Sequence, residues 1–151
     1  MRKVYAIEKN CINCHLCELY CRLAHSDYDD LVALYHAPAG EVSPSRVRVQ
    51  EKSPHSFAVQ CRHCEEPECV RACISGAMVK NPVTGIVSCE VNKCVGCLSC
   101  VLACPNSAVQ PGLIGGGKKA IKCDLCQHRE NPACVEHCPN RALIFVERKE
   151  A

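Results

Sequence analysis

The chain has 151 residues, of which 17 are cysteine, about 11% and an unusually large share for a short protein. Its 18 basic and 16 acidic residues give a formal net charge of +2 and little support for nucleic-acid binding, although Lys118, Lys119 and Lys122 form a short basic run. No stretch of 18 consecutive apolar residues occurs, and the first residues contain no apolar signal segment. We therefore expect no transmembrane segment, no secretory signal and a cytoplasmic location.

Short strands and helical turns are predicted between long loops. In chain order, the β-prone runs lie at 4–7, 47–49, 57–59, 85–87 and 143–146, most of them beside a cysteine loop. Helical stretches are predicted at 17–24 and 100–104, with one more turn near 31–35 inside the otherwise loop-like segment 24–60. The connector from Pro111 to Gly117 is predicted to be a flexible turn. With 2 Phe, 4 Tyr and no Trp, the ordinary apolar core is thin, so something bound to cysteine must stabilise the fold.

Sixteen cysteines form four groups of four, and Cys89 is left over. Each group opens with C-x-x-C and closes with C-x-x-x-C, and the middle gap is two residues in the first and third groups, four in the second and seven in the fourth. The groups are Cys11, Cys14, Cys17, Cys21; Cys61, Cys64, Cys69, Cys73; Cys94, Cys97, Cys100, Cys104; and Cys123, Cys126, Cys134, Cys138. An alanine follows the last cysteine by four residues in the last three groups, whereas His25 takes that place in the first. The sequence therefore contains one cysteine motif repeated four times.

The spacing C-x2-C-x2-C-x3-C-P is that of bacterial ferredoxins, in which three cysteines bind one cubane and the fourth ligates the other cluster of a pair. The fourth cysteine lies about one helical turn beyond the loop and faces away from the cluster that the loop encloses, so such motifs work in pairs. Four motifs supply sixteen ligands, the requirement of four 4Fe-4S clusters. Zinc would leave the close third cysteine and the prolines at 105 and 139 unexplained, and disulfides fit poorly with 17 thiols in a reducing cytosol.

These motifs resemble the four-cluster ferredoxin-like electron-transfer subunits that accompany dimethyl sulfoxide reductase, formate dehydrogenase, nickel-iron hydrogenases and carbon monoxide dehydrogenase. The most specific stretches are 61–69, 93–97, 122–126 and 132–134. The segments 14–19, 25–26 and 54–58 look most like the short form found with carbon monoxide dehydrogenase and tungsten aldehyde oxidoreductase.

The resemblance implies an α+β fold of two ferredoxin-like dicluster modules, small and cluster-stabilised, with short strands, helical turns and long loops. An outer module would comprise residues 1–55 and 112–151 with motifs one and four, and an inserted module would comprise 56–111 with motifs two and three. Carried over residue by residue, the four ligand sets are Cys11, Cys14, Cys17, Cys138; Cys123, Cys126, Cys134, Cys21; Cys61, Cys64, Cys69, Cys104; and Cys94, Cys97, Cys100, Cys73. Cys21 and Cys73 lack the following proline, which removes no ligand.

The function implied is a relay of single electrons along four 4Fe-4S clusters. The partners would be a catalytic subunit, namely carbon monoxide dehydrogenase, a tungsten or molybdenum enzyme or a hydrogenase, and a second electron carrier or flavoprotein. The sequence contains no dinucleotide-binding, P-loop or flavin motif. We therefore expect no substrate site and no enzyme activity of the protein's own. A freely diffusing polyferredoxin and a zinc-stabilised structural protein remain alternatives.

Several residues near the motifs have weaker interpretations. Basic residues close to the loops are expected to raise the potentials of nearby clusters, unless they form only a solvated turn; they are Arg62, Lys93, Lys118, Lys119 and Lys122. Four histidines inside the motifs are expected to lie beside the clusters or at the surface rather than to ligate; they are His15, His63, His128 and His137. Cys89 is expected to be a buried small hydrophobic residue.

Overall fold

The computed structural model describes residues 1–38 and 40–147, and the last four residues of the predicted outer module, 148–151, lie outside them. Within the described residues the strands are β1 (Lys3–Ala6), β2 (Val47–Lys52), β3 (His55–Gln60), β4 (Met78–Lys80), β5 (Val87–Cys89), β6 (Val109–Ile114), β7 (Gly117–Lys122) and β8 (Leu143–Val146). The helices are α1 (Leu16–Leu23), α2 (Leu31–Tyr35), α3 (Glu68–Arg71), α4 (Ser99–Ala103) and α5 (Ala133–Glu136), with 3-10 turns η1 (Glu8–Asn10) and η2 (Val91–Lys93).

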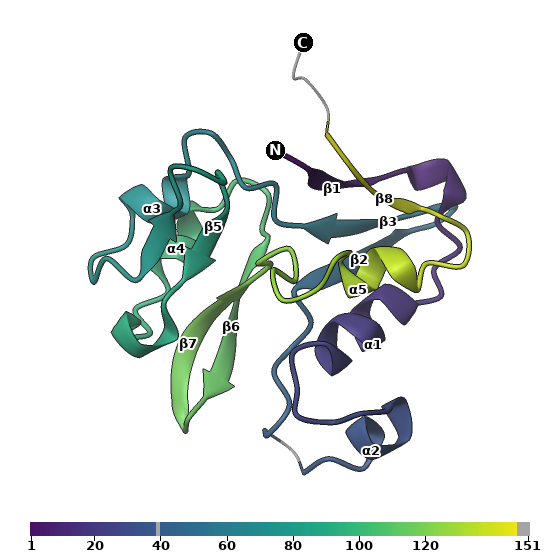
Figure 1. Cartoon of the computed structure of the whole chain (residues 1–151), viewed down its shortest axis with the longest axis horizontal. Helices are drawn as coiled ribbons and strands as arrows, with labels where there is room; N and C mark the ends of the chain where they lie inside the picture. The colour runs from purple at the N-terminus through teal and green to yellow at the C-terminus, as the bar shows by residue number, and fades with distance from the viewer. Residues whose placement is uncertain (39, 148–151) are drawn as a thin grey trace.

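The strands form four separate antiparallel pairs rather than one sheet. Neighbouring strands in the sequence make three of them, β2–β3, β4–β5 and β6–β7. The fourth joins the two ends of the chain, with Lys3 opposite Val146 and Ala6 opposite Leu143. Figure 1 shows the consequence: β1 and β8 lie in one lobe with β2, β3, α1 and α5, and the middle of the chain forms a second lobe with α3, α4 and β5.

Two small hydrophobic cores lie in the molecule, and cysteine supplies a large part of each. The first contains Val4, Val47, Val49, Ala58, Leu125 and Leu143 with Cys17, Cys21 and Cys134, and its flanking cysteines are Cys11, Cys123 and Cys138. The second contains Ala77, Met78, Val87, Val109 and Ala120 with Cys69, Cys94 and Cys100, flanked by Cys73, Cys89 and Cys104. The first core therefore takes its cysteines from motifs one and four, and the second takes its motif cysteines from motifs two and three.

The predicted elements are found with small shifts at their ends, apart from one connector. The runs at 4–7, 47–49, 57–59 and 143–146 form β1, β2, β3 and β8, and 85–87 overlaps β5. The turn at 31–35 is α2, because the Asp30 carboxylate caps it by accepting the N–H groups of Val32 and Ala33, both at 2.8 Å.

The prediction of a flexible turn from Pro111 to Gly117 is wrong. These residues belong to the β6–β7 hairpin, in which only Gly115 and Gly116 make the turn. Gly116 has a positive φ of +76°, and its neighbour has +59°. A two-residue hairpin turn with positive φ at both positions requires residues of this kind, so the glycines mark the tip of a hairpin rather than a loose linker.

The β6–β7 hairpin also fixes a cysteine loop. Gly96, inside the loop Cys94–Cys97, has a φ of +73°, and a Cβ there would lie 2.2 Å from the carbonyl oxygen of Lys118 in β7. The loop and the hairpin therefore approach so closely that a side chain at position 96 cannot fit without a backbone shift.

Replacing Gly96 with alanine tests this approach. Gly116→Ala is a matched control, because its φ is also positive but a Cβ there meets nothing within 4 Å. We expect Gly116→Ala to cost the left-handed conformation alone, about 1–2 kcal/mol, or roughly 2–8 °C in melting temperature. Gly96→Ala should lower the melting temperature further, as followed by circular dichroism. Equal losses in the two variants would contradict the close approach.

Candidate metal centres

The four cysteine motifs share one local geometry. The third cysteine of each motif is the second residue of a short helix, and these cysteines are Cys17 in α1, Cys69 in α3, Cys100 in α4 and Cys134 in α5. The residue just before the second cysteine has a positive φ in every motif, and these residues are Asn13, His63, Gly96 and Leu125. Three of the four are not glycine, so the backbone accepts a strained turn here. This turn curls each C-x-x-C loop around a common centre.

The fourth cysteine of each of the last three motifs receives a local backbone hydrogen bond. Ala108 donates its N–H to the Cys104 sulfur at 3.3 Å, and Ala142 donates to Cys138 at 3.1 Å. In the second motif Met78 donates to Cys73 at 3.3 Å. In all three motifs the residue three positions after the cysteine has a positive φ, and these residues are Gly76, Ser107 and Arg141. The turn directs the following amide back to the sulfur, which explains why an alanine recurs close to this place in the sequence.

In the first motif the sulfur of the fourth cysteine has a different hydrogen-bond donor. Helix α1 continues past Cys21, and the residue three positions later, Ala24, keeps a helical φ of −64°. The Cys21 sulfur instead accepts the backbone N–H of Arg46 at 3.2 Å, from a segment far along the sequence. The motif in which His25 replaces the repeated alanine is therefore also the one whose fourth cysteine accepts from a distant residue instead of from its own motif.

Two of the four predicted ligand sets surround cavities. Cys11, Cys14, Cys17 and Cys138 line one small cavity, and Cys61, Cys64, Cys69 and Cys104 line another, each with a volume of about 20 Å³. Both are partly open to solvent. We call these groups site A and site C.

The other two sets are also brought together. Cys134 is buried among Cys123, Cys21, Cys126 and Cys17, whose charges add to the effect of burial and raise its pKa well above the ordinary value. Cys100 lies close to Cys73, Cys94 and Cys97, and burial and these neighbours raise its pKa. We call Cys21, Cys123, Cys126 and Cys134 site B, and Cys73, Cys94, Cys97 and Cys100 site D.

The electrostatics of the cysteines suit metal binding. Burial above all raises the pKa of Cys17 to about 12 and that of Cys69 to about 11. Burial likewise raises the pKa of Cys123 to about 12. Thiols so placed ionise only when a cation takes up the negative charge, and coordination to metal supplies that cation. The clustered thiols, the N–H···S bonds and the cavities together fit a cysteine-bound metal cluster.

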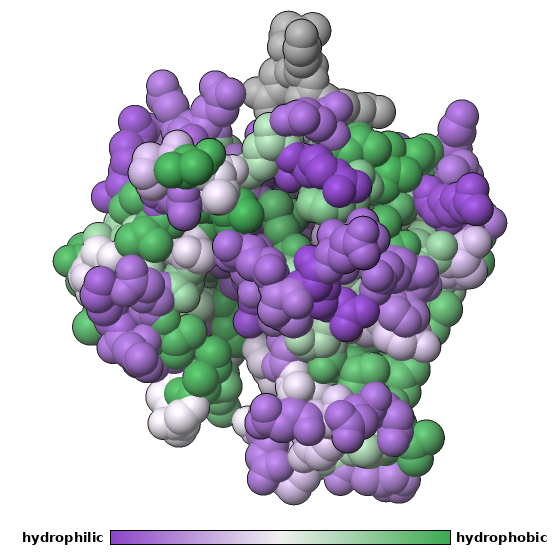
Figure 2. All heavy atoms as spheres, viewed as in Figure 1, coloured by the Kyte–Doolittle hydropathy of each residue, from purple (hydrophilic) through white to green (hydrophobic). Residues whose placement is uncertain are grey.

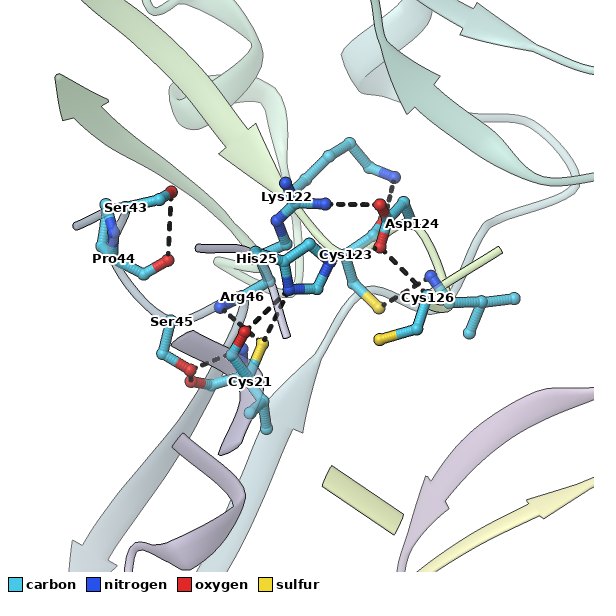
Figure 3. Close-up of polar contacts among 12 residues, drawn as sticks. Cys21, His25, Ser43, Pro44, Ser45, Arg46, Lys122, Cys123, Asp124 and Cys126 are labelled. Carbon is cyan, nitrogen blue, oxygen red and sulfur yellow. Dashed lines mark hydrogen bonds and ion pairs between the residues drawn. The ribbon is translucent and has the colours of Figure 1, made fainter. Parts of the chain in front are cut away.

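A charged network missing from the sequence prediction lies beside site B (Figure 3). His25 sits between Cys21 and Asp124, with its Nδ1 2.7 Å from the Cys21 carbonyl oxygen and its Nε2 3.0 Å from an Asp124 carboxylate oxygen. The second carboxylate oxygen pairs with the Arg46 guanidinium at 2.6 Å. Both ring nitrogens of His25 face acceptors, so the ring is an imidazolium that donates twice.

The network changes the pKa of its members. Burial opposes the charge of His25, but hydrogen bonds to Asp124, Cys126 and Cys21 outweigh it and raise the pKa to about 11. For Asp124 burial acts toward a higher pKa, but His25 and Arg46 outweigh it and hold the pKa below its ordinary value. The sequence offered one signal for this network, the histidine in the place of the repeated alanine.

Lys122 and His63 are both buried rather than exposed at the surface. The side chain of Lys122 is buried, so the interpretation of a solvated basic turn is wrong for this residue. Its ammonium donates to the carbonyl oxygens of Val87 and Cys123. His63 is fully buried, and burial followed by the charge of Lys122 lowers its pKa to about 3, so the ring is neutral.

Cys89 lies in β5 opposite Met78 and beside site D. It is half-buried and packs against the second core, so the expectation of a small hydrophobic residue is met in part. Burial raises the pKa of its thiol to about 12, with Cys94 and Cys100 adding to the effect.

The fold and these sites define a protein that binds metal clusters through cysteine, and comparison with known proteins places it further. Residues 53–148 match the family described as the 4Fe-4S dicluster domain. The sequence is 35% identical over 163 residues to the electron transport protein HydN of Escherichia coli (strain K12), an alignment that covers 99% of this chain and 90% of that protein.

Two further relatives are larger. The B subunit of anaerobic dimethyl sulfoxide reductase of E. coli (strain K12) is 36% identical over 146 residues, covering 89% of this chain and 68% of that protein. The putative oxidoreductase AegA of E. coli (strain K12) is 39% identical over 151 residues, but the alignment spans only 22% of its length. The protein belongs to the 4Fe-4S dicluster family of iron-sulfur electron-transport proteins, as its sequence motifs predicted, and its cofactor is the 4Fe-4S cluster.

No helix in the described residues is long and apolar enough to cross a membrane.

The charged network beside site B predicts a pH-dependent contribution to stability. Because the folded pKa of His25 is about 11, above the ordinary 6.5, its contribution is complete below pH 6.5 and is lost as the pH rises toward 11. Asp124, whose folded pKa is lowered, contributes above its ordinary pKa of 3.8 and loses this contribution in acid. His25→Gln should therefore lower the melting temperature more at pH 6 than at pH 9.5.

The control for this prediction is His15→Gln. His15 pairs with Glu18 and Glu51, but its side chain is 38% exposed, so water screens the interaction and the loss should be small. A stability loss in His25→Gln that is the same at both pH values would contradict the charged pair.

Proposed function

We propose that this protein is the electron-transfer subunit of an anaerobic oxidoreductase complex, carrying four 4Fe-4S clusters that relay single electrons between a catalytic subunit and a second redox carrier. The observation that carries the proposal is the gathering of sixteen cysteines into four groups of four in a protein whose relatives include an electron transport protein and a reductase subunit. A bound 4Fe-4S cluster supplies a one-electron couple.

The ligand assignment follows the same groups. The proposed ligands are Cys11, Cys14, Cys17, Cys138 at site A; Cys21, Cys123, Cys126, Cys134 at site B; Cys61, Cys64, Cys69, Cys104 at site C; and Cys73, Cys94, Cys97, Cys100 at site D. Each set takes three cysteines from one motif and one from another. The fold would then be α+β with an outer module, 1–55 and 112–151, around an inserted module, 56–111. The separate hydrophobic cores favour this division, although the β2–β3 hairpin runs across the boundary at residue 55.

The sites form a series in the order A, B, C, D. The charge of Cys17 in site A contributes to the raised pKa of Cys134 in site B, and the charge of Cys61 in site C contributes to that of Cys123 in site B. The charge of Cys100 in site D likewise contributes to the raised pKa of Cys69 in site C. Electrons would enter and leave at the ends of such a series.

The two ends are also the accessible ones. Cys14 of site A and Cys97 of site D are the exposed cysteines of the motifs. Large apolar side chains lie open beside them, with Ile12 59% and Val95 66% exposed. Figure 2 shows hydrophobic residues at the surface of the lobe that holds α3 and α4. Redox partners that dock over these apolar residues would come close to a terminal cluster.

The partners proposed are a molybdenum or tungsten enzyme, a carbon monoxide dehydrogenase or a hydrogenase at one end, and an electron carrier or flavoprotein at the other. The match to the B subunit of dimethyl sulfoxide reductase favours a catalytic partner of this kind. The protein itself would have no substrate site and act in the cytoplasm. A freely diffusing polyferredoxin is the second candidate, favoured by the match to HydN over 90% of its length.

Metal analysis of protein isolated without oxygen tests the cofactor content. We expect about sixteen iron and about sixteen acid-labile sulfide per chain. Molybdenum, tungsten or nickel that copurifies would identify the catalytic class, whereas iron alone would favour the diffusing carrier. Zinc with little sulfide would overturn the proposal.

Serine substitutions test the pairing of the motifs. Because Cys21 is assigned to site B, Cys21→Ser should alter the same cluster signal in electron paramagnetic resonance (EPR) spectra as Cys123→Ser. Cys138→Ser should alter the same signal as Cys11→Ser. Cys89→Ser is the control and should leave all four clusters unchanged. A Cys21→Ser variant that alters the Cys11 signal would refute the crossed pairing.

A further inference from the structure

A polar bridge centred on Val87 links the loop of site C to the strand that leads into site B. Val87 lies in β5 and is 1% exposed. Its N–H donates to Nδ1 of His63 at 3.0 Å, and its carbonyl oxygen accepts from the ammonium of Lys122. The same ammonium donates to the carbonyl oxygen of Cys123 at 2.9 Å. Because His63 stands between two proposed ligands of site C and Cys123 is a proposed ligand of site B, the bridge joins these two sites.

Lys122 carries a charge that the protein around it does not neutralise. Its side chain is 4% exposed, and the hydrogen-bond partners found for its ammonium in the described residues are two carbonyl oxygens. Asp124, two residues along, is already engaged by His25 and Arg46. A buried cation without an anionic partner is strongly disfavoured, so an anion must lie nearby.

The contacts of Lys122 identify where that anion lies. Its ammonium donates to the carbonyl oxygen of Cys123, a proposed ligand of site B, and to that of Val87, which lines the cavity at site C. A cubane with four thiolate ligands is itself an anion. Lys122 is therefore placed to be the common counter-charge of the clusters at sites B and C.

His63 supplies the second half of the bridge. Because Nδ1 accepts from Val87, the proton of the neutral ring is on Nε2. His63 is 1% exposed, and within residues 1–38 and 40–147 its Nε2 has no hydrogen-bond partner. An N–H buried without an acceptor is rare and costly. A sulfur of a bound cluster would supply the acceptor that Nε2 lacks.

We propose that Lys122 and His63 raise the reduction potentials of the two central clusters, at sites B and C, and so favour electron transfer from a terminal cluster into this pair. Lys122 stabilises the extra negative charge of either reduced cluster, and Nε2–H of His63 donates to a sulfur of one of them. In this step one cluster loses one electron as the other gains it, and both side chains keep their protons. The inference rests on the proposed four-cluster function.

The test is a redox titration followed by EPR on the full-length protein with its clusters, comparing the wild type with Lys122→Met. We expect two of the four midpoint potentials to shift to lower values and two to stay unchanged. Lys122→Arg, which keeps the charge, should restore both. Lys118→Met is the matched control, because it removes the same charge from an exposed position on the same strand, and it should leave the central pair unchanged.

The second variant is His63→Asn, since asparagine tolerates the positive φ of 45° at this position and can still accept from Val87 but has no Nε2–H. It should lower one central midpoint potential. A spectroscopic measurement complements the titration: pulsed EPR with ¹⁵N-labelled histidine should show a histidine N–H coupling that His63→Asn abolishes, distinct from any coupling of His25, which lies beside Cys21 and Cys126 and should persist in that variant.

The outcomes separate this inference from the proposed function. Full iron and sulfide with four unchanged midpoints in Lys122→Met, or with one changed, would overturn the bridge alone. Histidine couplings that are the same in the wild type and in His63→Asn would remove the role of His63. A wild type without about sixteen iron would overturn the four-cluster function first.

Discussion

The cysteine sulfur is the group on which this structure depends, because it serves as core side chain and as ligand at once. The two cores are small, and beside a few valines, leucines, alanines and one methionine, their buried residues are motif cysteines. A buried thiol contributes as a small apolar group, but the raised pKa values at Cys17, Cys69 and Cys123 show that the ionised form cannot persist there unaided. Metal binding and folding are therefore coupled: the ligands are buried because the fold closes over them, and the fold closes because they are bound.

The repeat in the sequence is a repeat of backbone geometry more than of side chains. Each unit needs a left-handed residue before the second cysteine and a helix that starts just before the third. Asparagine, histidine, glycine and leucine all fill the left-handed place, although only glycine adopts it without strain. Such strain persists where the surroundings impose it, and cysteines fixed to one centre impose it on the loop between them. The middle gap can vary because it lies between the loop and the helix.

Sequence reasoning found the elements that local chemistry determines. It predicted the turn that forms α2, which the structure shows to be capped by Asp30, and β-prone runs marked β1, β2, β3 and β8. It missed α3 and α5, since four-residue helices after Pro67 and Pro132 have no periodicity to detect. It also took the glycines of the β6–β7 turn for a flexible connector, because three glycines in a row do not reveal that the flanking residues pair.

The ligand groups could be inferred from spacing and resemblance, whereas the residues that surround them could not. Lys122 and the exposed Lys118 lie in the same short run of mixed polar and apolar residues, and nothing in the sequence indicates that one is buried and the other exposed. Its burial is a tertiary effect, since it depends on Val87, a strand away, offering a carbonyl oxygen. His25 and Asp124 are 99 residues apart, and only the closing of the two ends of the protein brings them together. Charges of this kind can be located only from the folded structure.

The distribution of these charges gives the series of sites an electrostatic profile. His25, Arg46 and Lys122 place three cations against one carboxylate, Asp124, around sites B and C. At site A, by contrast, His15 faces Glu18 and Glu51, and Glu18 acts on Cys17 in the same direction as burial, against the thiolate. The surroundings are thus more positive at sites B and C than at site A, where Cys14 is exposed. If clusters occupy all four sites, these charges stabilise an added electron better at sites B and C than at site A, whereas at site D the ammonium of Lys119, which donates to the Cys94 carbonyl oxygen, supplies a cation of its own. Under the proposed function, an electron that enters at site A would therefore be drawn toward the two central clusters.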